Sequence, residues 1–136
     1  KTQYWIREIM NRMYRNNIDG LCGNDDCGQM SAWYVLSAMG FYPVCPGTDQ
    51  YVIGAPYLPY MKLTLENGKE LVIKADKVSD KNRYVKSVKL NGKPYHKAFI
   101  GQQDIMNGGE LTFEMSSQPN KQRIFKGENR PYSLSE

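Results

Sequence analysis

Apolar residues recur at helical spacing in the first part of the chain, and mostly charged or amide side chains fill the opposite face. The residues on the apolar face are Ile6, Ile9, Met10, Met13 and Tyr14. This period predicts an amphipathic helix over residues 3–15, with Thr2 as its N-cap. Residues 16–28 are rich in Asn, Asp and Gly, which predicts a loop after the helix.

A second predicted helix begins at Gln29 or slightly earlier and is apolar on nearly every side. Its apolar residues are Ala32, Trp33, Tyr34, Val35, Leu36, Ala38 and Met39. Gly40 predicts a left-handed C-cap, and Pro43 prevents the helix from resuming. A helix that is apolar all round is typically buried on all sides, and a single partner helix cannot cover it. Since the chain also starts at Lys1 without a Met, we expect a piece of a longer or processed protein, with partner helices elsewhere.

Beyond Pro46 the apolar period changes to two. Apolar and polar residues alternate over 61–65 and again over 71–75, with Asn67-Gly68 between the two runs. Asn-Gly between alternating runs is the strongest short-range signal of a β-hairpin. The other predicted elements are a second hairpin over 84–95 about Asn91-Gly92, a short helical turn at Ile105 and Met106, and a strand over 111–115. Together they indicate five or six short antiparallel strands, as in a small sandwich or half-barrel.

These patterns predict an α+β chain in three parts. Residues 1–46 carry the helices and the acidic loop, and residues 47–119 form an antiparallel β-rich module. Pro and Gly cluster near the boundary between them. Residues 120–136 are polar and without period, so we expect a weakly ordered tail.

Composition narrows the classes of function. The chain has 136 residues and a net charge of +4, without a Lys/Arg block or an aromatic RNA-binding motif, which argues against nucleic-acid binding. No apolar run reaches the roughly 18 residues of a membrane span. The three Cys form no C-x-x-C pair and the single His is distant in sequence, so a zinc site is not indicated. Buried free thiols are the default expectation, while a Cys22–Cys27 disulfide and the redox compartment stay open.

The acidic loop before the second helix is the first place to look for chemistry, because buried carboxylates are costly unless they are satisfied or used. Asp26, with Gln29 three residues later, fits a loosely defined capping box. Asp26 also fits a functional role, since a carboxylate at a helix N-terminus has its ionised form favoured, which suits a general base. The two roles can coexist. Asn24, Asp25 and Asp26 could also supply oxygen ligands to calcium, but the EF-hand spacing is absent.

The stretch from Gly20 to Val35, continued by Gly40-Phe41-Tyr42-Pro43, closely resembles the signature of the family 92 glycoside hydrolases. These are calcium-dependent, exo-acting α-mannosidases abundant in gut Bacteroidetes. The similarity continues through the β-rich region to Pro119-Asn120-Lys121. The resemblance implies a parent with an N-terminal β-sandwich and a C-terminal (α/α)6 barrel. This chain would then hold the last helices of the barrel and the terminal β-module.

The resemblance also implies roles for residues of the acidic loop. The family inverts configuration, which needs a carboxylic acid on one side of the sugar and a carboxylate base on the other. By position, the base falls on Asp26. A second family carboxylate, which helps to hold the water, falls on Asn24, here an amide that can position the water but cannot share the base role. Asp25 would point away, and the general acid, a Glu, has no counterpart in this chain.

The remaining implications concern partners and location. Calcium is implied, with ligands mostly outside this chain, so no metal-ligating or cofactor-binding residue is assigned here. The expected partners are mannose-containing glycans, such as α-1,2-linked N-glycan or mannan material, and the remainder of the parent enzyme. The family implies a periplasmic, surface or extracellular location, and the fragment alone should be inactive. The alternative is a non-catalytic structural or carbohydrate-binding module.

Overall fold

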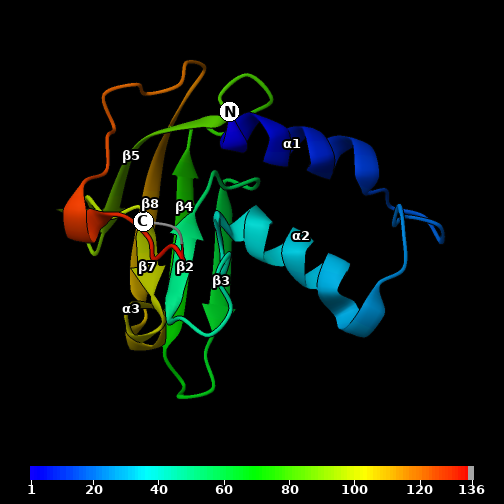
Figure 1. Ribbon diagram of the computed structural model, residues 1–136, viewed down its shortest axis with the longest axis horizontal. Coiled ribbons are helices and arrows are strands. Elements are labelled where there is room, and N and C mark those ends of the chain that lie inside the picture. Colours follow the sequence, from blue (N-terminus) through cyan, green and yellow to red (C-terminus); the bar gives the residue numbers. More distant parts are fainter. Residues whose placement is uncertain (135–136) are drawn as a thin grey trace.

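The computed structural model describes residues 1–134, which form an α+β fold with three α-helices and two β-sheets (Figure 1). The helices are α1 (Thr2–Met13), α2 (Gln29–Met39) and α3 (Gln102–Asn107), with 3-10 turns at Asp26–Gly28 and Gly127–Asn129. Helices α1 and α2 lie to one side of the sheets and are joined at the end farthest from them (Figure 1). The acidic loop is in this distant connection, and no (α/α)6 barrel is formed within residues 1–134.

Helix α1 forms where the apolar period predicts it, but its N-cap differs from the prediction. Lys1 is the N-cap residue, and its carbonyl accepts a hydrogen bond from the amide of Trp5 at 3.1 Å. That bond places Thr2 inside the first helical turn, so the assignment of Thr2 as the cap is wrong.

Helix α2 begins at Gln29 and ends at Gly40, as predicted. Gly40 has φ 94°, and its amide is within hydrogen-bonding reach of the carbonyls of Leu36 and Ser37, which satisfies the helix end. We expected α2 to be buried on all sides. Within residues 1–134, only its C-terminal end, Ser37–Met39, is buried. Val35 is 52% exposed.

The strands form two sheets. The smaller sheet is antiparallel, in the order β1 (Phe41–Tyr42), β2 (Gln50–Ile53), β7 (Phe99–Gly101). The larger sheet has the order β3 (Tyr60–Thr64), β4 (Glu70–Asp76), β8 (Gly109–Ser116), β5 (Tyr84–Leu90), β6 (Lys93–Pro94). Both predicted hairpins are present, as β3–β4 and β5–β6. The chain thus has more strands than expected, because β1, β2 and β7 are too short to show a clear alternation.

The prediction of a wholly antiparallel module is wrong at one pairing. Strand β8 inserts between the two hairpins and runs parallel to β4, while it pairs antiparallel with β5. A parallel pair needs a long crossover. Here the crossover is the whole segment between Asp76 and Gly109, which contains the second hairpin, β7 and α3.

One apolar core joins the two sheets and the end of α2. Strands β4 and β8 alternate buried and less buried residues, as expected of strands with one face on a core. The residues with 0% exposure are Leu71, Ile73, Ile100, Leu111 and Phe113. Met39 at the end of α2 belongs to the same cluster, so the core holds α2 at its C-terminal end.

The segment after Ser116 has little regular structure, yet it is hydrogen-bonded to the sheets, in contrast to the weak order expected. The carbonyl of Asn129 accepts from the amide of Ala98 at 2.8 Å, and the Asn120 amide group donates to the carbonyl of Lys86 at 2.9 Å. The predicted domain boundaries stay predictions, and residues 135–136 of the predicted tail lie outside the described residues.

A buried arginine attaches α1 to the rest of the fold. Arg7 is 4% exposed, and its Nη2 donates to the carbonyl of Pro56 at 2.7 Å. The guanidinium also lies 4.5 Å from the ring centre of Tyr57. These contacts fix the position of α1 against the segment that follows the smaller sheet's second strand.

We predict that Arg7→Met lowers the free energy of unfolding by about 1–3 kcal/mol, because the Pro56 carbonyl loses its donor in a buried place. Chemical denaturation measures the change. Arg12→Ala is the matched control, since Arg12 lies on the same helix with a side chain 71% exposed and an ion pair to Glu8. An effect of Arg7→Met no larger than that of the control would contradict the anchoring role.

Candidate active site at the start of α2

The connection between α1 and α2 is held near its ends. Tyr14 forms an isolated β-bridge with Leu21, and the amide of Arg15 donates to the carbonyl of Gly20 at 2.8 Å. A Cβ on Gly20 would lie 2.1 Å from the carbonyl oxygen of Arg15, so this close approach requires glycine. The Tyr14 hydroxyl donates to the carbonyl of Met30 at 3.0 Å, which ties the loop to the first turn of α2.

Asp25 is the residue that caps α2. Its Oδ1 accepts hydrogen bonds from the backbone amides of Met30 at 2.8 Å and Ser31 at 3.1 Å. Its Oδ2 accepts from the Ser31 hydroxyl at 2.6 Å. The Ser31 hydroxyl and the Ser31 backbone amide hold the pKa of Asp25 below its usual value. Desolvation opposes this shift, and the Met30 amide adds a smaller lowering effect. The Asp25 carboxylate therefore faces the first turn of α2.

The predicted capping box of Asp26 and Gln29 is therefore wrong. Asp26 begins the 3-10 turn that precedes α2, and Cys27 and Gly28 then adopt left-handed conformations with φ 55° and 74°. These two left-handed residues bring the Asp25 carboxylate, rather than the Asp26 carboxylate, over the first amides of α2.

Asp26 is exposed, and its carboxylate makes no hydrogen bond or ion pair with any residue in 1–134. The neighbouring Asn24 is also exposed and has no such contact within the same range. Asp26 lies one turn before the N-terminus of α2. An exposed carboxylate without a hydrogen-bond partner can accept a proton from water.

The loop does not form a metal cage in the part of the chain that the structure describes. No group of three or more His, Cys, Asp or Glu side chains is placed to hold a metal ion there. Both oxygens of Asp25 already accept hydrogen bonds from α2, which removes one of the three oxygen-bearing residues considered for calcium. Cys22, Cys27 and Cys45 are all free thiols, and no Cys22–Cys27 disulfide is formed. The expectation that these thiols are buried is wrong, because Cys22 and Cys27 are exposed and Cys45 is only half-buried.

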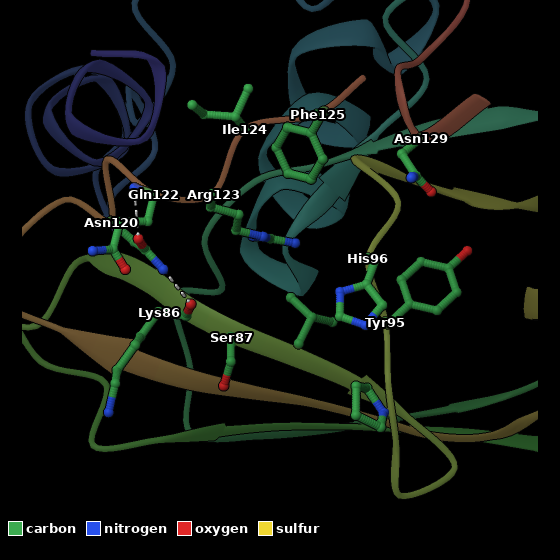
Figure 2. Close-up of a pocket in the computed structure, with 12 residues that line it drawn as sticks. Lys86, Ser87, Tyr95, His96, Asn120, Gln122, Arg123, Ile124, Phe125 and Asn129 are labelled. Atoms are coloured by element: carbon green, nitrogen blue, oxygen red, sulfur yellow. Dashed lines mark hydrogen bonds between the residues drawn. The ribbon is translucent and has the colours of Figure 1, made fainter. Parts of the chain in front are cut away.

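A separate cavity lies between β5 and the C-terminal segment (Figure 2), on the side of the sheets away from the α1–α2 connection (Figure 1). It has a volume of about 500 Å³, and Tyr95, His96 and Arg123 are among the residues that line it. Nη2 of Arg123 is buried without a hydrogen-bond partner in residues 1–134, and the guanidinium lies 5.0 Å from the ring centre of Phe125. Neither Asn24 nor Asp26 lines this cavity, so it is distinct from the acidic loop. Sequence reasoning missed it because Arg123 is in a segment without period.

Comparisons with known proteins identify the family. The model of the glycosyl hydrolase family 92 catalytic domain matches residues 1–117. The family 92 α-mannosidase BT3965 from Bacteroides thetaiotaomicron, solved in complex with mannoimidazole, is 47% identical over 98% of this chain, with a TM-score of 0.91. The inverting mannosidase BT2199 from Bacteroides thetaiotaomicron VPI-5482 is 41% identical over 99% of this chain, with a TM-score of 0.89. An uncharacterised secreted glycosidase from Arthroderma benhamiae is 30% identical over 77% of this chain.

The chain therefore belongs to glycosyl hydrolase family 92. It spans only 18% of the length of each of the two solved mannosidases and 14% of the fungal relative. The family that the acidic motif predicts, glycoside hydrolase family 92, is thus confirmed. None of the helices in residues 1–134 has the length and apolar character that crossing a membrane requires.

We predict that Asp25→Ala destabilises the protein at neutral pH, whereas Asp26→Ala does not, because only Asp25 caps α2. Since the pKa of Asp25 is lowered by folding, its contribution is complete above its unfolded pKa of about 3.9. The contribution is lost as the pH falls through the lowered folded pKa.

Denaturation of the wild type and both variants as a function of pH measures this difference. The gap between wild type and Asp25→Ala should close in acid. Equal effects of the two substitutions at neutral pH would contradict the assignment of the cap.

Proposed function

We propose that this chain is the C-terminal part of the catalytic region of a calcium-dependent, inverting exo-α-mannosidase, and that it supplies the general base Asp26. Membership of family 92 supports the reaction class. The description of BT2199 as an inverting mannosidase and the mannoimidazole complex of BT3965 support the stereochemistry and the sugar. The preferred substrates in the proposal are α-1,2-linked mannosides of N-glycan or mannan type.

The assignment of Asp26 is supported by the different contacts of two adjacent aspartates, Asp25 and Asp26. From the sequence, the competing role for Asp26 was that of helix cap. Asp25 fills that role with three hydrogen bonds, and Asp26 keeps an exposed carboxylate without a partner in residues 1–134. Asp26 is therefore available to act on a water molecule.

Inverting hydrolysis constrains where the other groups must lie. A carboxylic acid protonates the leaving oxygen, and a carboxylate on the opposite face takes a proton from the attacking water, with roughly 6.5–9.5 Å between the two carboxyl groups. In this proposal Asp26 takes the proton and the amide of Asn24 helps to orient the water. The general acid is a Glu of the remainder of the parent enzyme.

The exposed apolar face of the helices supports a larger catalytic domain. The exposed apolar residues of α1 and α2 are Tyr4, Trp5, Ile9, Met13 and Val35. Several large apolar side chains exposed on the same pair of helices are consistent with an interface. We propose that the remaining helices of an (α/α)6 barrel cover it, which agrees with the 18% share of the solved relatives that this chain spans.

Two parts of the proposal rest on the family alone. Calcium is assigned to the parent enzyme through the family resemblance, with ligands mostly from its other segments. Export from the cytoplasm is proposed because the fungal relative is described as secreted.

We predict that Asp26→Ala in the full-length enzyme lowers kcat by about a hundredfold to ten-thousandfold, the usual range for loss of a general base. Steady-state kinetics on an α-1,2-mannobiose measures the change. Asp19→Ala is the matched control, since Asp19 is another exposed aspartate of the same connection. A loss below about tenfold, or about 1.4 kcal/mol of barrier, would remove Asp26 from the catalytic role.

The isolated 136-residue chain should release no mannose from α-1,2-mannobiose, because it lacks the proposed general acid. The same chain should show no mannose binding in titration calorimetry, with or without calcium. Mannose binding by the isolated chain would favour the alternative role of a carbohydrate-binding module. Mannose release would overturn the assignment of the acid to another segment.

A further inference from the structure

The backbone that joins Asp26 to α2 is unusual. Cys27 has φ 55° although it is not glycine, and Gly28 follows with φ 74°. Residues with a Cβ rarely adopt this conformation, and it persists only where the surrounding structure enforces it. The segment between Asp26 and the helix is therefore held in place by contacts on either side of it.

Asp25 provides those contacts. Its carboxylate reaches past Asp26, Cys27 and Gly28 to three donors on Met30 and Ser31, at 2.6–3.1 Å. Its own carbonyl accepts from the amide of Gly28 at 3.0 Å. Asp25 is thus hydrogen-bonded to Gly28 and to the first turn of α2. Together with the chain, these bonds form a small ring that includes the Asp26 backbone.

Asp26 is exposed, and no hydrogen bond or ion pair from residues 1–134 orients its carboxylate. Its position is therefore set by its backbone, and its backbone is set by the ring that Asp25 closes. A catalytic group displaced by about 1 Å can lose about a hundredfold in rate even when the substitution is outside the chemistry.

We propose that Asp25 is a positioning residue, which holds the Asp26 carboxylate in line with the attacking water by fixing the left-handed turn between them and α2. This inference rests on the proposed function, since it needs Asp26 as the base. It differs from a purely structural cap, which would stabilise the helix without affecting the turnover of folded enzyme.

Three variants of the full-length enzyme separate positioning from stability. Asp25→Ala removes the acceptors, whereas Asp25→Asn keeps an amide oxygen for the Met30 and Ser31 amides. Asp104→Ala is the matched control, because Asp104 caps α3 on another part of the fold, where its Oδ2 accepts from the amide of Gly101 at 3.4 Å and from the Tyr95 hydroxyl at 3.3 Å. The readouts are kcat and KM on an aryl α-mannoside, corrected for the folded fraction.

Asp25→Ala should lower kcat by about tenfold to a hundredfold with KM changed by less than about threefold. Asp25→Asn should restore kcat to within about threefold of wild type, and Asp104→Ala should leave kcat unchanged even if it lowers the melting temperature. If Asp25→Ala fails to fold, Ser31→Ala removes one of the three bonds and should show a smaller loss in kcat, again with KM preserved.

If folded Asp25→Ala has the kcat of the wild type, the proposal is overturned and Asp25 is only a cap. Where Asp25→Ala does not fold, a wild-type kcat for Ser31→Ala has the same meaning. Equal losses in Asp25→Ala and Asp25→Asn would also overturn it, since the charge rather than the geometry would then matter. Asp26→Ala, assayed alongside, distinguishes this failure from failure of the proposed function. If Asp26→Ala retains activity, the base is elsewhere, whatever the Asp25 variants do.

Discussion

The first backbone amides of α2 have no acceptor within the helix, and this constraint decides how the acidic loop is organised. Two adjacent aspartates compete for these amides, and Asp25 takes them because the left-handed turn at Cys27 and Gly28 carries the chain back toward the helix. Asp26 is thereby left exposed at the positive end of the helix. Asp25 thus supplies the acceptors that the first amides of α2 need, and the Asp26 carboxylate is left without a hydrogen-bond partner in residues 1–134.

Helix α2 links this loop to the apolar core. Its C-terminal end packs through Met39 into the cluster that joins both sheets, and Gly40 lies so close to Pro56 that a Cβ would approach the ring to 2.9 Å. The amide of Tyr57 donates to the carbonyl of Ala38 at 2.9 Å, and the ring of Tyr57 lies under Arg7 of α1. Both helices are thus attached to the same short segment, so the β-rich part of the chain sets the orientation from which the acidic loop extends.

Much of the fold is predictable because it follows local rules. The period of α1, the start and end of α2 and the Asn91-Gly92 hairpin depend on residues near one another in sequence, and Asn91 and Gly92 have the positive φ values that such a turn requires. The parallel pairing of β4 with β8 is not predictable in this way, because it depends on which hairpin edges meet after a long crossover. The exposure of Val35 also departs from the pattern, since a helix that is apolar on all sides signals burial without saying what buries it.

The acidic, glycine-flanked sequence predicts the candidate site, and this stays a prediction, but the assignment of the helix cap to Asp26 was wrong. The sequence assigned the cap to Asp26 because Asp and Gln three residues apart fit a capping box, and a left-handed cysteine has no sequence signal comparable to that of glycine. The structure moves the cap to Asp25, which strengthens the proposal that Asp26 is the base.

A crystal structure of the full-length enzyme with a mannose-like inhibitor would test the central claim most directly. The account predicts a water molecule on the face of the sugar opposite the leaving group, within about 2.6–3.2 Å of an Asp26 carboxylate oxygen. Asp25 should remain bonded to the amides of Met30 and Ser31 in that structure. A water molecule held by a different carboxylate, with Asp26 directed into solvent, would contradict the account.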